Sequence, residues 1–176
     1  MMSASTDAIT DVCNYLKQLS GSLNTEMIRK EGIKNIISRV ADKIDEAGLL
    51  EVKTSFSGDP VWVAPERELL ILQVMNEALL NAITHSGASR ITISLHYQPN
   101  DSEFAVVDNG KGFQYPVAGS AGSGTGLRSI ITNARALRGM YNIFTSPGSG
   151  TLIFLSFPNR EKHKNGSKRW VSTISW

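Results

Sequence analysis

The spacing of apolar residues predicts three long helices in the first half of the chain. Over residues 7–20 these residues recur every three or four positions, which is the period of an amphipathic helix. The same period returns over residues 25–47, with Gly48 as the expected stop, and over residues 65–85, which Pro65 suits as a first helical position. The third helix is apolar on nearly every side, so we expect it to lie inside the domain.

Alternation of apolar and polar residues predicts strands in the rest of the chain. A loop rich in glycine and serine over residues 110–126 and a helix over residues 127–137 interrupt them. Two helices come first and strands mix with helices afterwards, so the predicted fold class is α+β, with one sheet covered by helices on one face. The predicted strands are residues 50–56, 90–97, 103–108, 141–145 and 151–157.

Composition narrows the class of protein. A chain of 176 residues with 41% hydrophobic content can bury one sizeable core. Its net charge of +2 is too small to indicate a nucleic acid or an anionic membrane as partner. The single cysteine, Cys13, excludes an intrachain disulfide and suits a reducing compartment, and the N-terminus has no signal-peptide pattern. Residues 159–176 are basic and have no period, so we expect a frayed tail there.

Polar residues form a stripe on the third predicted helix. Gln73, Glu77, Asn81 and His85 recur every four residues and therefore share one face. A solvated face is the usual explanation, but apolar residues flank the stripe on both sides. Because a buried polar group without a partner costs roughly 2–7 kcal/mol, a ligand is an equally good explanation.

The segment DNGKGF, residues 108–113, follows an apolar strand. Asp-Asn-Gly after a strand is an ordinary turn signal, which is the simpler interpretation. Asp108, however, ends the strand where its carboxylate would face a pocket, and the spacing of Gly110 and Gly112 lets a backbone approach a flat ligand closely. Taken alone, the segment is more typical of a turn than of a site.

A third polar segment, GSAGSGTGLRS over residues 119–129, leads into a predicted helix. Free backbone N–H groups and the helix dipole at such a junction favour an anion. The segment is not a Walker loop, because Thr125 stands where a lysine is required, and it lacks the glycine spacing and βαβ unit of a dinucleotide fingerprint. A flexible linker is the alternative interpretation.

Taken in order, these segments resemble the ATP site of the GHKL superfamily, which comprises DNA gyrase, heat-shock chaperone, histidine kinase and mismatch-repair ATPases. NEALLNAITHS resembles the N box, DNGKGF the first glycine box, GSGTGL the second, and GTLIFLSFP, residues 150–158, the closing Gly-Thr strand. The resemblance extends from about residue 52 to residue 158. It implies a Bergerat-type two-layer α/β sandwich, with a mixed sheet covered by helices on one face and an N-terminal helical extension.

Within the superfamily the chain most resembles sensor histidine kinases of the nitrate-sensor type. The shared features are an Asn-x-x-x-His N box, a short ATP lid over residues 114–123, and the helix GLRSIITNARALRG. This resemblance implies three parts. They are the end of a dimerisation helix or a linker over residues 1–22, the ATP-binding catalytic domain over residues 23–158, and the tail over residues 159–176.

The resemblance also implies a role for each polar side chain. Asn81 would offer its amide oxygen to Mg²⁺, a hard cation that prefers oxygen ligands. Glu77 would act as a base or as an orienting group for the nucleophile. His85 would contact phosphate oxygens, although a histidine at a helix end can also simply face solvent. Asp108 would accept a hydrogen bond from the adenine amino group of ATP.

Backbone groups complete the implied ATP site. Gly110 and Gly112 would leave room for the base, and Thr151 would support Asp108 through a water molecule. N–H groups of the second glycine box would wrap the triphosphate, so that phosphoryl transfer requires mainly positioning and charge neutralisation. These N–H groups belong to Gly124, Thr125, Gly126 and Leu127.

One component of a histidine kinase is missing from the chain. The resemblance requires an acceptor histidine, followed by an acidic residue, on a dimerising hairpin, and none of His85, His96 and His163 has that motif. The implied partners are therefore the dimerisation and phosphotransfer domain of a homodimeric parent and, indirectly, a response regulator. A cytoplasmic location is implied, with no nucleic acid and no direct membrane contact by this chain. Two alternatives stay open: a stand-alone serine kinase of the anti-sigma-factor type, and a nucleotide-binding regulatory module without turnover.

Overall fold

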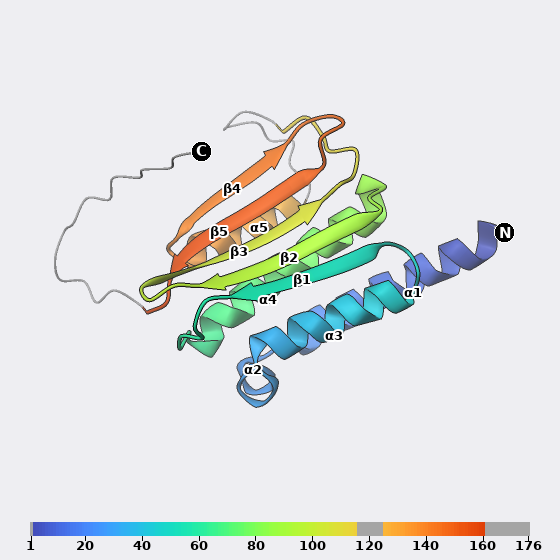
Figure 1. Cartoon of the computed structure of the whole chain (residues 1–176). Helices are drawn as coiled ribbons and strands as arrows, with labels where there is room; N and C mark the ends of the chain where they lie inside the picture. Colours follow the sequence, from blue (N-terminus) through green and yellow to red (C-terminus); the bar gives the residue numbers. More distant parts are fainter. Residues whose placement is uncertain (1, 116–124, 161–176) are drawn as a thin grey trace.

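The computed structural model describes residues 2–115 and 125–160, with side chains from Thr6 onward. Helices and strands mix along the chain after three N-terminal helices (Figure 1). The elements are α1 (Met2–Ser22), α2 (Thr25–Glu31), α3 (Ile33–Glu46), β1 (Glu51–Ser57), α4 (Pro65–Asn81), η1 (Ala82–Ser86), β2 (Arg90–Tyr97), β3 (Asp101–Asp108), α5 (Thr125–Ala136), β4 (Met140–Thr145) and β5 (Thr151–Pro158).

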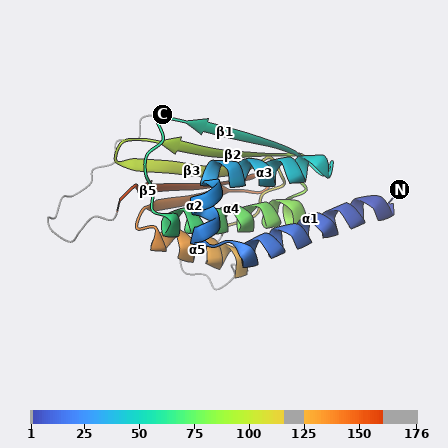
Figure 2. The same ribbon diagram turned by 90° about the horizontal axis from the view of Figure 1, so that it is seen from below.

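The strands form one mixed sheet in the order β1-β2-β3-β5-β4. β1 pairs with β2 in parallel, and the other neighbouring strands are antiparallel. The helices lie on one face of this sheet, as the two views in Figures 1 and 2 show. The predicted α+β class, with a sheet covered by helices on one face, is confirmed.

The core lies between the sheet and the helices. In β2, for example, Ile91, Ile93 and Leu95 are buried, whereas the residues between them are not. α4 buries apolar residues on several sides, as its sequence predicts. Because α4 is fixed along most of its length, it holds the polar stripe near its C-terminal end in a defined position.

The prediction of a single helix over residues 25–47 is wrong, because the structure has two helices separated at Gly32. This glycine has φ 77° and ψ 146°, a conformation that other residues rarely adopt. Its N–H donates to Ile28 O at 2.8 Å and ends α2. Ile28 and Ile33 both stay buried, so the apolar period continues across the break and does not reveal it.

Among the other boundaries that differ from the sequence prediction, two lie at the polar segments. The helix predicted over residues 65–85 is α-helical only to Asn81, and it ends in the π-helical turn η1. Such turns are rare in proteins, and those that do occur are often found at functional sites. α5 begins at Thr125 rather than at the predicted Leu127.

The first and last described elements are both attached to the domain. α1 contacts α4 and η1, and it buries residues such as Val12 and Leu16 in the core. At the other end Asn159, the first residue of the predicted tail, is buried beside β3. Residues 161–176 of that tail lie outside the described residues. Within the described part of the chain, no helix combines the length and the apolar character needed to cross a membrane.

Candidate functional site

The polar stripe of α4 leads to a cavity of about 520 Å³ at the end of the helix. Asn81 is the last α-helical residue, and the π-helical turn after it is closed by the Ser86 hydroxyl, which donates to Ala82 O at 2.7 Å. Asn81 and His85 both line the cavity. Gln73, Glu77 and Asn81 are half-buried and His85 is exposed, so none of these polar residues is enclosed in the core.

Asp108 lies at the end of β3, as predicted, and its side chain lines the same cavity. Its Oδ1 accepts a hydrogen bond from Gly110 N at 2.8 Å, which folds the loop back under the strand end. The next residue, Asn109, attaches this loop to the start of β2. Its Oδ1 accepts from Ser89 N at 3.0 Å and from Arg90 N at 2.9 Å. The position of Asp108 is therefore defined by the protein itself.

The glycines of this loop are required by close approaches within the chain. A Cβ on Gly110 would lie 2.5 Å from Ser86 Cβ, and a Cβ on Gly112 would lie 2.1 Å from Ser146 O. Gly112 also has φ 58°, which favours glycine. The resemblance assigned both glycines to the room around a base. The structure adds a second reason, the close approach of neighbouring atoms of the chain. Of the two glycines, Gly112 is among the described residues that line the cavity and Gly110 is not.

The N-terminus of α5 meets the end of α4 at this cavity. Thr125, Gly126 and Leu127 line it. The first N–H groups of a helix have no partner within the helix, and together with the dipole they favour an anion. A Cβ on Gly126 would lie 3.0 Å from Glu77 Oε2 and 3.3 Å from Asn81 Nδ2. Gly126 thus brings the start of α5 close to the acidic and amide groups of α4, although Glu77 is not among the described residues that line the cavity.

Part of the predicted site lies outside the described residues. Gly124 of the second glycine box is not described, and of the lid predicted over residues 114–123 only Gln114 and Tyr115 are. The ring centroids of Phe113 and Tyr115 lie 6.2 Å apart at an interplanar angle of 69°. Phe113 and Gln114 line the cavity, so the start of the predicted lid is at its rim.

Thr151 lies opposite Asp108 in the pairing of β5 with β3, and it also lines the cavity. In the neighbouring strand Thr145 lies opposite Thr151. The Thr145 hydroxyl donates to Gly150 O at 2.9 Å, accepts from Phe113 N at 3.1 Å and is 3.3 Å from Thr151 Oγ1. Thr145 was not predicted as a site residue, because only the register of β4 with β5 places it opposite Thr151.

Lys111 is a second residue of the cavity that the sequence analysis did not assign. Its N–H donates to Ser86 O at 2.9 Å and its carbonyl accepts from Gly148 N at 2.6 Å, so its backbone connects η1 with the turn between β4 and β5. Its position between the two glycines of DNGKGF could have predicted that it lies at the cavity. The remaining described lining residues are Ala78, Ala82, Thr84, Ser86 and Ile153.

The donor groups of the cavity limit what it can hold. Among the described residues no group of three or more His, Cys, Asp or Glu side chains is placed to hold a metal ion. The Asn81 amide oxygen could supply one ligand to Mg²⁺, a cation that usually takes most of its ligands from phosphates and water. Asp108 accepts hydrogen bonds, whereas His85, Lys111 and the α5 terminus favour negative charge. This set suits a phosphorylated molecule that carries an N–H donor, and the volume is that of an ordinary ligand pocket.

Comparison with known proteins agrees with this geometry. Residues 66–161 match the family described as histidine kinase-, DNA gyrase B-, and HSP90-like ATPase. Sensor histidine kinase LiaS of Bacillus subtilis (strain 168) is 25% identical over 161 residues, covering 92% of this chain and 44% of the relative. Sensor histidine kinase MctS of Rhizobium johnstonii is 26% identical over 147 residues, covering 83% of this chain and 32% of the relative. The chain therefore spans less than half the length of these relatives.

Two solved structures share the fold. Histidine kinase AdeS of Acinetobacter baumannii has a TM-score of 0.56 at 18% identity, covering 87% of this chain and 76% of that one. The blue-light activated histidine kinase of Erythrobacter litoralis EL346 has a TM-score of 0.54 at 20% identity, covering 70% of this chain and 44% of that one. With the family match over more than half of the chain, the predicted ATP-binding domain is confirmed: the chain belongs to the histidine kinase-, DNA gyrase B-, and HSP90-like ATPases and forms a catalytic domain of the histidine kinase type.

Proposed function

We propose that this chain serves a sensor histidine kinase by transferring the γ-phosphoryl group of Mg-ATP to a histidine on a dimerisation domain outside this sequence. The observation that carries the proposal is the meeting of three motifs at one cavity. Asn81 comes from α4, Asp108 comes from the end of β3, and Gly126 comes from the first turn of α5, with Glu77 of α4 beside Gly126. Each motif alone has a simpler explanation, but together they match the requirements of a nucleotide and its metal.

Within this proposal, each group has one task. Asp108 accepts a hydrogen bond from the adenine amino group. Asn81 would offer its amide oxygen to Mg²⁺, which would help to neutralise the charge of the phosphates. The N–H groups that begin with Gly126 hold the triphosphate, and His85 contacts phosphate oxygens from the rim of the cavity.

The transfer step needs positioning more than covalent help from the protein. A ring nitrogen of the acceptor histidine attacks the γ-phosphorus, so that a P–N bond forms while the P–O bond to ADP breaks. Glu77 orients the acceptor imidazole or takes up the proton of its other ring nitrogen. The carboxylate of Glu77 beside Gly126 suits this role, since it adjoins the helix terminus proposed to hold the phosphates.

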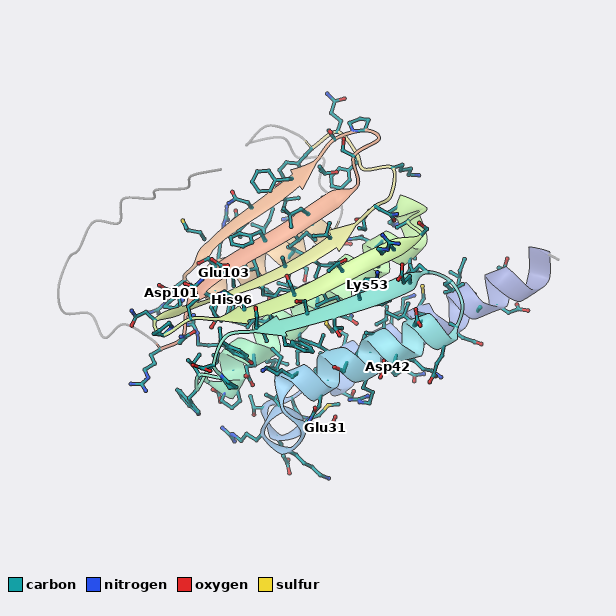
Figure 3. The ribbon with its side chains drawn as sticks, in the orientation of Figure 1. Glu31, Asp42, Lys53, His96, Asp101 and Glu103 are labelled. Carbon is teal, nitrogen blue, oxygen red and sulfur yellow. The ribbon has the colours of Figure 1, made fainter. Side chains whose placement is uncertain are left out.

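The acceptor is expected on a partner domain. His85 is used at the cavity, and His96 is on the outer face of β2 (Figure 3). Its Nδ1 lies 2.8 Å from Ser57 Oγ. His163 lies outside the described residues. We therefore include in the proposal a homodimeric parent of the nitrate-sensor type that supplies the acceptor hairpin in the cytoplasm and passes the phosphoryl group to a response regulator.

Radiolabelled ATP with Mg²⁺ tests the proposal, using the chain alone and with the parent's dimerising hairpin added. Acid-labile label is expected on the hairpin and not on the chain. Glu77→Gln should reduce this transfer at least tenfold while changing ATP affinity much less, because a group that acts in the reaction stabilises the transition state more than the bound nucleotide.

Glu66→Gln is the matched control, because it makes the same change on the same helix at an exposed residue outside the cavity. Transfer by this variant should equal that of the wild type. Acid-labile label on the chain alone would refute the inference that the acceptor histidine lies outside this sequence. Acid-stable label on a serine of another protein would favour the anti-sigma-type kinase, and ATP binding without any transfer would favour the regulatory module.

A further inference from the structure

Four residues on the inner face of the sheet form one row across the strands, and two of them line the cavity. Strand pairing aligns Ile91, Asp108, Thr151 and Thr145, which come from β2, β3, β5 and β4. Asp108 and Thr151 line the cavity, whereas Thr145 stands beyond them at the edge of the sheet. The Thr145 side chain can therefore control the direction in which the Thr151 hydroxyl faces the cavity.

The hydrogen bonds of Thr145 fix the direction of this contact. A threonine hydroxyl has one hydrogen and two lone pairs. The hydrogen of Thr145 is donated to Gly150 O at 2.9 Å, and one lone pair accepts from Phe113 N at 3.1 Å. What is left toward Thr151, whose Oγ1 is 3.3 Å away, is a lone pair. Thr151 must therefore be the donor in this contact.

The consequence appears on the cavity side of Thr151. When its hydrogen points to Thr145, only the lone pairs of Thr151 face the cavity. The Asp108 carboxylate beside it also accepts hydrogen bonds only, so both groups in this part of the wall are acceptors. A ligand with N–H donors fits such a wall, whereas a carbonyl oxygen would face two acceptors.

We propose that Thr145 is a positioning residue that holds Thr151 as a hydrogen-bond acceptor and thereby makes the site prefer a purine with a 6-amino group to one with a 6-oxo group. This inference rests on the proposed ATP site and adds the residue that sets its selectivity. Without the Thr145 hydroxyl, Thr151 can rotate and donate to a 6-oxo group, so the preference should become smaller.

The experiment is calorimetry with Mg-ATP and Mg-ITP, because ITP has a 6-oxo group and an N1–H where ATP has a 6-amino group and an unprotonated N1. Thr145→Val keeps the shape and strand preference of threonine and removes the hydroxyl, Thr145→Ala is a second hydroxyl-free variant, and Thr145→Ser keeps the hydroxyl. The ratio of the ITP and ATP dissociation constants should fall about five- to tenfold in the valine and alanine variants, the usual worth of one hydrogen bond. It should stay within about twofold of wild type in the serine variant.

A purely structural role for Thr145 would weaken both nucleotides alike and leave the ratio unchanged, which would overturn the inference. An equal fall of the ratio in the serine and valine variants would also overturn it. Amide exchange at Phe113 should become faster in the valine variant if the hydroxyl holds that N–H as described. Wild type that binds no ATP would remove the proposed function and this inference with it. A wild-type preference for ATP that survives in the valine variant would remove the inference alone.

Discussion

Gly126 lies so close to Glu77 that a Cβ on the glycine would be 3.0 Å from the carboxylate Oε2, with the Asn81 Oδ1 at 3.4 Å. The absence of a side chain at the first turn of α5 lets the helix terminus approach both polar groups of α4. Residue 126 therefore controls the spacing between the proposed triphosphate site and the group proposed to act on the acceptor.

Gly126→Ala should separate folding from transfer. The helix should tolerate alanine, which is the better helix former, because the nearest atom is the end of a flexible side chain. Glu77 must shift, however, and phosphotransfer to an added hairpin should fall about tenfold or more. Gly21→Ala in α1 is the matched control, since a Cβ there meets nothing within 4 Å. Equal transfer rates in the two variants would show that the spacing is unimportant.

Asp108→Asn tests the adenine assignment. Asparagine keeps an oxygen for the Gly110 N–H but loses the charge, so ATP should bind more weakly by about 1.5–3 kcal/mol, the usual worth of a hydrogen bond to a charged group. Titration calorimetry with ATP and GTP measures it, and Asp101→Asn at the opposite end of β3 is the control. The assignment would be wrong if wild type bound the two nucleotides equally and the variant changed neither.

Glu68 makes stability depend on pH. Burial raises the pKa of its carboxyl from 4.5 to about 7 in the fold, and burial together with the Glu68 charge raises the pKa of Tyr97 to about 12. Because the folded-state pKa of Glu68 is the higher one, its contribution is fully present below pH 4.5 and is lost as the pH rises through about 7.

Glu68→Gln should remove this part of the pH dependence. At pH 8 the variant should be more stable than wild type by about 1 kcal/mol, since the remaining contact of the side chain with water reduces the cost of its charge. At pH 4 the difference should disappear. Urea unfolding at both pH values measures the effect, with the exposed Glu66→Gln as control. A difference that is the same at both pH values would contradict the burial of Glu68.

Hydrogen bonds of Asn159 connect the end of β5 to the hairpin formed by β2 and β3. Its Oδ1 accepts from Ser102 Oγ at 2.6 Å, its Nδ2 donates to Gln98 O at 2.7 Å, and its N–H donates to Asn100 O at 2.9 Å. Asn159→Ala should cost about 1–3 kcal/mol of unfolding free energy, because it leaves the fully buried Ser102 hydroxyl without this acceptor. Arg160→Ala, at the exposed neighbour, should change little in the same urea titration. Equal stability of the two variants would show that the domain ends before residue 159.

The periodic elements could be predicted from the sequence, because their apolar residues face a single core. Gly32 shows the limit of this signal: the apolar period runs unbroken through it, and only its backbone conformation separates α2 from α3. The π-helical turn η1 could not be predicted from the spacing of apolar residues either. Its last residue contacts a distant segment, since Lys111 N donates to Ser86 O.

The candidate site divides in the same way. Motif order predicted that Asn81, His85, Asp108 and Thr151 share a site, and the structure has all four around one cavity. Thr145 and Asn109 were missed because their importance arises from strand register and from the approach of two loops. Neither relationship is visible in a residue pattern along one segment.

The central claim is that this cavity binds an adenine nucleotide, and amide chemical-shift mapping tests it most directly. With Mg²⁺ and a non-hydrolysable ATP analogue, we expect saturable shift changes at Asn81, His85, Asp108, Gly126 and Thr151. The polar groove between α1 and α3, which Tyr15 and Arg39 border, should show none. An unchanged spectrum at saturating nucleotide, or changes confined to that groove, would contradict the claim.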